Sequence, residues 1–312
     1  MKKDFKTSIG GQALIEGIMM RGPKKSAMAI RLPDGSVDVE EWDTPFGSGK
    51  WFYKTPFIRG IFNMVGSMRV GYKCMMTSAE KSGMLEEEEP SRFEKWMSEK
   101  LGDKFGKVLA GLSMVVAVIF SVGLFVVLPL FLAGLISRVG HINFNPTSRA
   151  LVEGVIRITL FVLYVLLVSR MKDIRRVFEY HGAEHKTIAC YEAGEPLTLE
   201  NIRTKSRFHS RCGTSFLVIV LVISILIFSV IQWESVLARV LVRTALLPVV
   251  IGIAYEIIKL AGRYDNIFTR LISAPGRWLQ RLTSYEPDDG QIEIAIAAMQ
   301  VVIPKESGAD AW

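Results

Sequence analysis

The chain has 312 residues, of which half are hydrophobic, and a formal net charge of +7. Its mean hydropathy is positive. Together these values are typical of an integral membrane protein with basic cytosolic segments, and they argue against a soluble enzyme or a nucleic-acid-binding protein. The three cysteines, Cys74, Cys190 and Cys212, lie far apart in the sequence. They do not predict a disulfide framework and suit a reducing compartment.

Residues 1–105 are expected to form a cytosolic and interfacial module. Residues 27–32 and 36–42 read as two extended segments joined by a Pro-Asp-Gly turn, which predicts a β-hairpin. The glycine-rich run 10–23 precedes this hairpin. Its spacing is neither that of a phosphate loop nor that of a dinucleotide-binding loop, so we do not expect nucleotide binding.

Residues 57–76 predict an amphipathic helix. Its polar side carries Arg59, Asn63, Ser67, Arg69 and Lys73, and its apolar side carries Ile61, Met64, Val65, Met68, Tyr72 and Met75. One interpretation is a helix lying flat on the inner leaflet with its basic residues facing lipid headgroups. The other is a helix packed on the rest of the module. The acidic run 86–89, followed by Pro90, predicts a solvated linker before the membrane region.

Four apolar runs within residues 106–262 predict transmembrane helices, at 108–136, 151–169, 214–233 and 236–258. The first run is longer than the roughly 20 residues needed to cross a bilayer, so it should tilt, kink at Pro129 or lie partly along the interface. Lysine and arginine are concentrated in the N-terminal region, the 170–213 loop and the 263–312 tail. The positive-inside rule therefore predicts a multi-pass inner- or plasma-membrane protein with both termini and this loop in the cytosol.

Charged residues interrupt two of the runs. Glu153 and Arg157 are four residues apart in the second run, as are Arg239 and Arg243 in the fourth. The two pairs could neutralise one another across the bundle. They could line a polar conduit, or they could form a structural ion-pair lock near the helix ends. Glu256, near the other end of the fourth run, would approach the 170–213 loop.

The C-terminal tail, residues 263–312, is expected to contain one short helix. Glu286, Pro287, Asp288 and Asp289 precede the apolar run 292–302. Acidic residues before such a run are typical of a helix start. We expect this helix to dock on the cytosolic module. The predicted fold class is thus mainly α, a polytopic membrane protein with about four transmembrane helices and an N-terminal module.

Three of the four histidines lie in the polar stretch 180–214. His181 and His185 are four residues apart, so on a helix their imidazoles project from one face and can bind one metal ion. Glu184 directly precedes His185, and HGAEH satisfies the inverted zinc-hydrolase pattern HxxEH, in which the glutamate is the base. His209 and Cys212 follow with the two-residue gap of paired ligands. We therefore predict that His181, His185, His209 and Cys212 bind zinc or another divalent transition metal.

This ligand set has two metal-bound interpretations. If all four residues coordinate, the site is closed and structural, as in a zinc finger. If only three coordinate, water takes the fourth position, and Glu184 or Cys212 can act as base or nucleophile. A third interpretation is packing or capping histidines without metal. A basic cluster in the same loop favours an open site that holds a phosphate or carboxylate, but the positive-inside rule also explains it; it comprises Arg203, Lys205, Arg207 and Arg211.

Three segments of the chain, GGQALIEGIMMRGP, YHGAEHKTIACYE and FHSRCGTSF, resemble the bacterial DUF1385 family, the YqhQ-like membrane proteins. The similarity runs from about Gly10 to the segment EPDDGQIEIAIAAM. The resemblance implies a membrane protein that is predicted to be a metal-dependent enzyme. His181, Glu184, His185, His209 and Cys212 match the metal centre of that family. No substrate comes with the resemblance.

The sequence thus leads to the hypothesis of a membrane-embedded zinc hydrolase with Glu184 as general base. Because the site follows a transmembrane run, an amphiphilic substrate, such as a lipid headgroup or a membrane-protein segment, is favoured over a soluble metabolite. The alternative is a non-enzymatic membrane scaffold or transport-associated protein, in which zinc only fixes the loop. In that case the glycine-rich run would recruit a protein partner.

Overall fold

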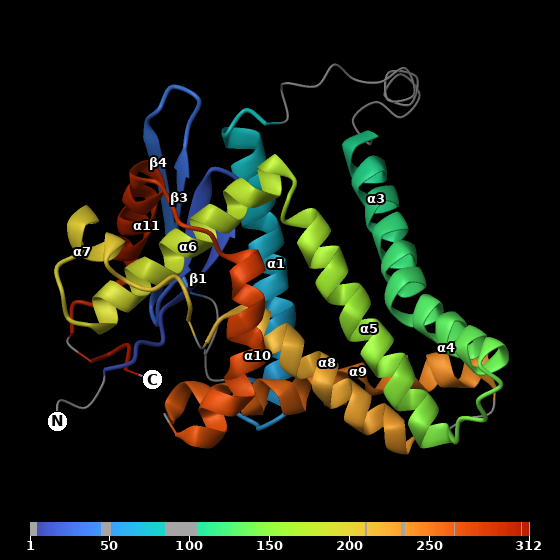
Figure 1. Cartoon of the computed structure of the whole chain (residues 1–312). Helices are drawn as coiled ribbons and strands as arrows, with labels where there is room; N and C mark the ends of the chain where they lie inside the picture. The colour runs from blue at the N-terminus through green and yellow to red at the C-terminus, as the bar shows by residue number, and fades with distance from the viewer. Residues whose placement is uncertain are drawn as a thin grey trace. The chain divides into compact units, whose positions relative to one another are not determined.

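The structure is a computed structural model that describes residues 5–44, 51–84, 105–209, 211–231, 235–264, 266–306 and 308–311. It is mainly helical with one small antiparallel sheet, as predicted (Figure 1). Contacts divide the chain into two compact units. The first comprises Met1–Met84, Val165–Ser224 and Leu246–Trp312, and the second comprises Leu85–Tyr164 and Ile225–Ala245. The sequence predicts a different division, into cytosolic and membrane modules. The contacts do not test that division, so it stays a prediction.

The first unit contains a four-stranded antiparallel sheet in the order β1-β2-β3-β4. Its strands are β1 (Gly10–Leu14), β2 (Gly17–Arg21), β3 (Lys25–Arg31) and β4 (Val37–Asp43). The predicted hairpin is β3 and β4, closed by Gly35 at a φ of 85°. The glycine-rich run, for which the sequence predicts no strand, forms β1 and β2. These strands pair from Gly10 with Arg21 to Leu14 with Gly17.

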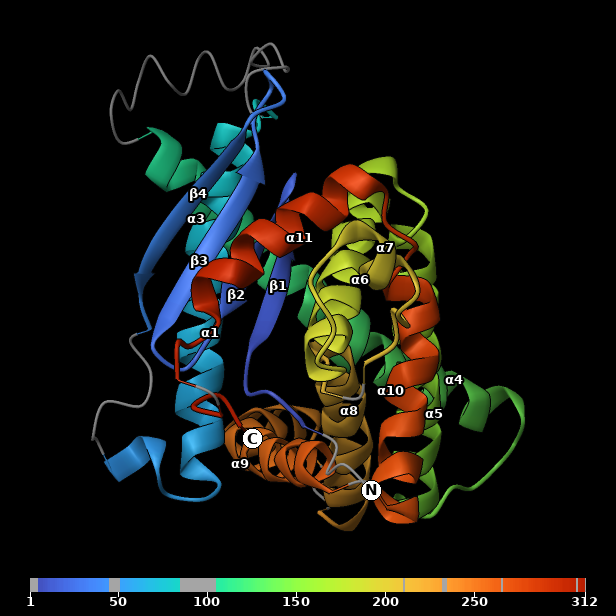
Figure 2. The same ribbon diagram turned by 90° about the vertical axis from the view of Figure 1, so that its left-hand side faces the viewer.

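Alternating side chains give the sheet two apolar faces. One face presents Ile18 and Met20 of β2 and Ala27 and Ala29 of β3 to a core shared with α6 (Lys172–Glu192), α7 (Leu199–Arg203) and α11 (Asp289–Val302). The other face packs against α1 (Ile58–Lys81). Figure 2 shows α11 crossing the sheet and α1 on the opposite face. The two-residue period of a strand therefore places the sheet between two helical layers.

Helix α1 is the predicted amphipathic helix, and it packs on the sheet through Cys74. Part of its polar side faces the protein, since Arg59 forms an ion pair with Glu256 and Ser67 accepts a hydrogen bond from Arg21, while Arg69 and Lys73 are exposed. Met75 of its apolar side packs on the sheet, but other large apolar side chains of the helix are exposed, namely Phe62, Val65, Met68, Tyr72 and Met76. The expectation that the basic side faces lipid headgroups is therefore wrong at Arg59.

The tail contains α10 (Ile267–Thr283) as well as the predicted helix, α11. Asp288 caps α11 by accepting from the backbone of Gln291, whose side chain accepts from the backbone of Asp288. Helix α11 docks in the core beside the sheet, as expected for its apolar run. Helix α10 was not predicted. It exposes Ile267, Phe268 and Leu271 immediately after a membrane-length helix.

Four helical segments in the described residues are long and apolar enough to cross a membrane: Gly111–Val139, Pro146–Val168, Gly213–Val230 and Val240–Arg263. They correspond to the four predicted runs. The first comprises most of α3 (Phe105–Val122), a π-helix, η3 (Gly123–Val127), and α4 (Leu128–Val139). The others lie in α5 (Pro146–Val168), α8 (Gly213–Val230) and α9 (Val236–Arg263). The predicted linker at 86–90 lies outside the described residues.

The first span is the irregular one, as the sequence predicts. Its π-helix ends one residue before α4 begins with Leu128 and Pro129. Proline has no N–H to donate to the carbonyl four residues earlier, which here is Phe125, so an α-helical ladder cannot continue through this point. A π-turn is a known way to accommodate such a break.

Candidate metal centre

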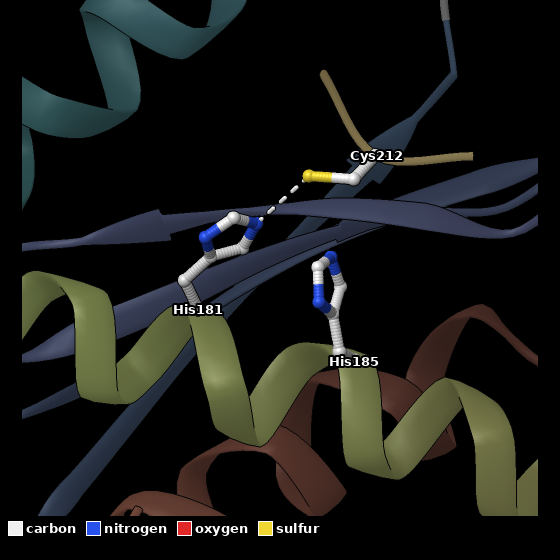
Figure 3. A group of neighbouring side chains, drawn as sticks. All are labelled: His181, His185 and Cys212. Carbon is white, nitrogen blue, oxygen red and sulfur yellow. Dashed lines mark hydrogen bonds between the residues drawn. The ribbon is translucent and has the colours of Figure 1, made fainter. Parts of the chain in front are cut away.

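Three side chains from two segments converge in the first unit (Figure 3). His181 and His185 lie one turn apart on α6, with ring centroids 4.3 Å from one another. Cys212 lies directly before α8. One ligand atom from each of the three residues lies within 4.8 Å of those from the other two. The structure thus places Cys212 beside the two histidines that the helical spacing pairs.

Backbone carbonyls orient both imidazoles. His181 Nδ1 is 2.6 Å from the carbonyl oxygen of Thr283, and His185 Nδ1 is 2.6 Å from that of Arg207. A carbonyl oxygen only accepts, so both Nδ1 atoms carry a proton and donate. The Nε2 of His181 is then directed at Cys212 Sγ, 3.2 Å away. This is the usual arrangement of metal-binding histidines, in which the second nitrogen is fixed by a carbonyl or carboxylate.

The surroundings favour a thiolate at Cys212. Burial alone would raise the pKa of this thiol, but His181 and His185 lower it well below its usual value. Burial alone would lower the pKa of His181, but Cys212 and Glu184 raise it to about 10. The amide and the hydroxyl of Thr214 also donate to Sγ, at 3.4 and 3.2 Å. The sulfur is therefore in the ionised form that binds metals.

Glu184 lies against the first strand. The backbone N–H of Gly11 donates to Glu184 Oε1 at 3.0 Å, and the glutamate side chain is almost fully buried. A Cβ at Gly11 would come within 2.8 Å of the Met19 carbonyl oxygen and 3.0 Å of Glu184 Cδ. Gly11 therefore permits the close approach of β1 to α6. The sequence offered no sign of this contact between residues that are 173 positions apart.

Gly182, the second residue of HGAEH, also permits the close approach of another segment. A Cβ there would lie 1.9 Å from the carbonyl oxygen of Tyr285. The N–H of Tyr285 donates to the carbonyl of Phe178 on the same helix. The segment between α10 and α11 thus lies directly along α6, and this contact positions the Thr283 carbonyl that orients His181.

His209, the fourth predicted ligand, lies near His181, His185 and Cys212, but its ring is not one of the three converging ligands. Its ring centroid is 5.6 Å from that of His185, and its Nε2 lies 3.7 Å from a Glu192 oxygen and 3.3 Å from Arg211. Burial lowers the pKa of His209. The buried amide of Gln280 holds the His209 backbone from both sides, accepting from its N–H at 2.8 Å and donating to its carbonyl at 2.7 Å.

The basic cluster of the loop is engaged within the protein. Its four members each form an ion pair: Arg203 with Asp289, Lys205 with Glu195, Arg207 with Glu286, and Arg211 with Glu192. These pairs tie the loop to α6 and to the α11 region. Glu256 does not join the histidines, because it binds Arg59 and the N–H of Phe57 at the start of α1.

A cavity of about 260 Å³ opens beside the three ligands. Its wall includes His181, His185, Cys212 and Glu184, together with His209 and Arg211 from the loop. Further wall residues come from the glycine-rich run and from α1; they are Gly10, Gly11, Gln12, Met19, Arg21, Ser67 and Val70. The glycine-rich run therefore forms part of the wall of this cavity.

The donor set fits a transition metal. Two imidazole nitrogens and one thiolate are ligands that zinc accepts, and the fixed Nδ1 atoms supply the outer hydrogen bonds such sites use. With three ligands converging, a tetrahedral ion would have one position left. The buried carboxylate of Glu184 lines the same cavity.

Comparisons with known proteins place the chain in a family. The family described as "Protein of unknown function (DUF1385)" matches residues 55–305. The chain is 34% identical over 308 residues to "Uncharacterized protein YqhQ" of Bacillus subtilis (strain 168), covering 96% of this chain and 93% of that protein. No solved structure matches the chain. The chain belongs to the DUF1385 family of proteins.

Proposed function

We propose that the protein is a metal-dependent hydrolase, with zinc as its metal, which acts at the cytosolic membrane surface on an amphiphilic substrate. The observation that carries the proposal is the convergence of His181, His185 and Cys212 within 4.8 Å at the wall of a cavity. A metal ion held by these three residues would have a fourth coordination position for water, as in catalytic zinc sites. Bound zinc would supply Lewis acidity and an activated water.

Glu184 is the residue we assign as general base. Its Oε1 is held by the Gly11 N–H, which fixes the side chain in one orientation. A carboxylate fixed in this way can take a proton from a water in the cavity and pass it to the leaving group. Its position directly before His185 on α6 keeps it within one helical turn of both histidines.

The amphiphilic character of the substrate rests on α1. This helix contributes Ser67 and Val70 to the cavity wall and exposes Val65, Met68 and Tyr72 elsewhere on its surface. Arg21 also lines the cavity and donates to Ser67 at 2.9 Å. A polar or anionic group in the cavity and an apolar portion along α1 would therefore suit a lipid headgroup or a membrane-protein segment.

The alternative is a scaffold or transport-associated protein with a structural zinc site. It is favoured by the distance of 5.6 Å between the rings of His185 and His209, because a modest change in the loop would add a fourth ligand. A closed site of four protein ligands has no position for water or substrate. The two candidates therefore differ in coordination number and in the importance of Glu184.

Metal content and one isosteric substitution test the proposal. The full chain, purified in detergent without chelators, should contain about one zinc ion per chain by mass spectrometry, and His181→Ala should lose it. Glu184→Gln keeps an acceptor for the Gly11 N–H, so it should keep the metal. Its hydrolysis of phospholipid esters or membrane peptides in mixed micelles should fall by roughly 10²- to 10⁴-fold, the usual contribution of a general base.

Glu200→Gln, an exposed position on α7, is the matched control and should change neither quantity. In a strain that lacks the gene, Glu184→Gln should fail to restore function while Glu200→Gln restores it. Normal complementation by Glu184→Gln would refute the hydrolase proposal. If His209→Ala also released the metal, the structural alternative would be favoured.

A further inference from the structure

A second cluster of charged side chains lies among the membrane-length helices of the second unit. It comprises Arg149, Glu153 and Arg157 on α5 and Arg243 on α9. The side chain of Glu153 is 2% exposed, and Arg157 as a residue is 8% exposed. Three positive charges and one negative charge leave two positive charges among these four residues. An excess of charge in a membrane-spanning region is costly and marks a functional site by default.

Two of the arginines contact the carboxylate of Glu153. Arg243 Nη2 donates to Glu153 Oε2 at 2.9 Å, and Arg149 Nε lies 3.4 Å from Glu153 Oε1. The pairing of Glu153 with an arginine of the fourth run is the neutralisation that the sequence predicted. One arginine is enough to neutralise the charge of Glu153, however. A structural ion-pair lock therefore does not explain the positive charges of the other two arginines.

Arg157 is held by the irregular part of the first span. Its Nε donates to the carbonyl of Phe125 in the π-helix at 2.9 Å. That carbonyl would be paired with the N–H of residue 129 in an α-helix, but residue 129 is proline. The ring of Phe125 also meets Phe161 and Tyr164 of α5 edge to face. Arg157 therefore links α5 to the π-helix of the first span.

Some donors of the cluster are left over. Arg149 Nε and the Nε and Nη1 of Arg243 are buried and make no hydrogen bond in the part of the chain that the structure describes. The guanidinium of Arg243 also lies 5.4 Å from the centre of the Phe228 ring. Within a bilayer there is no water to satisfy these N–H donors. A ligand with several hydrogen-bond acceptors would therefore stabilise them.

We propose that Arg149, Arg157 and Arg243, arranged around Glu153, bind an anionic phosphate group. The planar guanidinium fork matches the oxygens of a phosphate, and the charge of such a group would offset the two surplus positive charges. The side chain of Arg149 is 42% exposed, so the cluster is accessible at this edge. The phosphate belongs either to a phospholipid headgroup or to a free anion. This site is independent of the metal centre.

Thermal unfolding of the full chain in detergent tests the proposal. Phosphatidylglycerol, inorganic phosphate and diacylglycerol, which has the same acyl chains but no phosphate, are added separately. At about one hundred times its dissociation constant, a phosphate ligand should raise the unfolding midpoint by roughly 5 to 10 °C, while diacylglycerol should not. A shift with phosphatidylglycerol alone identifies a lipid, and a shift with inorganic phosphate alone identifies a free anion.

Substitutions assign the shift to the cluster. Arg149→Gln should reduce it at least threefold without harming the fold, since this side chain is partly exposed. The double variant Glu153→Gln with Arg243→Gln replaces the buried ion pair by a neutral pair and should lose the shift. Arg138→Gln, at an exposed position at the end of α4, should keep it. The proposal is overturned if the wild type shows no shift, if the double variant keeps it, or if Arg138→Gln loses it equally.

Discussion

At the scale of single residues, the site depends on positions where no side chain fits. Gly11 and Gly182 allow β1 and the Tyr285 carbonyl to lie against α6 on either side of the histidine-bearing turns. Neither glycine has a positive φ among the described backbone angles. The constraint is therefore close packing and not backbone conformation, and it explains why HGAEH and GGQ contain glycine at these positions.

Gly11→Ala provides a direct test, because the neighbouring Gly10 has no atom within 4 Å of an added Cβ. The methyl group at residue 11 should displace Glu184 or Met19 and lower the free energy of unfolding by about 1 to 3 kcal/mol, as overpacking usually does. Hydrolytic activity should fall with it if Glu184 is the base. Gly10→Ala should leave both unchanged. Equal thermal midpoints for the two variants would contradict this account of Gly11.

The residue scale also shows what local spacing can predict. The four-residue spacing of His181 and His185 predicts a shared helical face, and the structure has it. The spacing of His209 and Cys212 placed both as ligands, but only Cys212 is in the converging group. The direction of a loop side chain depends on distant partners, here Glu192 and Gln280.

At the scale of elements, the missed helix α10 proves to be the one that fixes the loop. Its C-terminal half carries Gln280 and Thr283, which bind the His209 backbone and His181 Nδ1. An apolar stripe of Ile267, Leu271 and Trp278 was available in the sequence, but Pro275 within it favours a helix break. The helix persists around this proline, with Gly276 packed against Ser215 at the start of α8.

Gln280→Leu should loosen the loop without disturbing α6. The substitution removes both hydrogen bonds to the His209 backbone and leaves two polar groups buried, a local cost of about 2 to 4 kcal/mol. Amide exchange at His209 should accelerate by roughly 30- to 1000-fold, measured by hydrogen–deuterium exchange with mass spectrometry. Gln300→Leu, an exposed position on α11, is the matched control. Unchanged exchange at His209 would show that Gln280 does not hold the loop.

The strands show the same division between local and distant information. The Pro-Asp-Gly turn was sufficient to predict β3 and β4. Strands β1 and β2 are not predicted because β1 begins with two glycines and β2 is apolar on both faces, at Ile18, Met19 and Met20, so neither shows the alternation of a half-buried strand. Their pairing becomes favourable only when α6 and α1 cover the two faces of the sheet.

At the scale of the whole molecule, the four membrane-length helices make the chain a multi-pass membrane protein. The side on which the termini lie stays a prediction of the positive-inside rule. An even number of crossings would place the sheet, the 170–213 loop and the tail on one side of the membrane. The short connection around Asn143 would lie on the other side.

Cysteine labelling in intact cells checks this orientation. The three natural cysteines are buried, so they give little background. Ser36→Cys and Glu200→Cys, both at exposed positions, should resist a membrane-impermeant maleimide until the cells are lysed. Asn143→Cys should react in intact cells. The reverse pattern would place the metal centre outside the cytosol and refute the proposed location of the hydrolase.

The sequence by itself determined the features that depend on local pattern. These are the four apolar runs, the hairpin, the capped helix α11 and the common helical face of His181 and His185, because hydropathy, turn residues and helical period act over a few residues. The tertiary structure decided which loop side chain meets the histidines, and it gave the glycine-rich run a place in the cavity wall. It also brought Arg157 to the carbonyl left open by Pro129. These outcomes depend on contacts between residues far apart in the sequence, and only the packing of the folded chain specifies them.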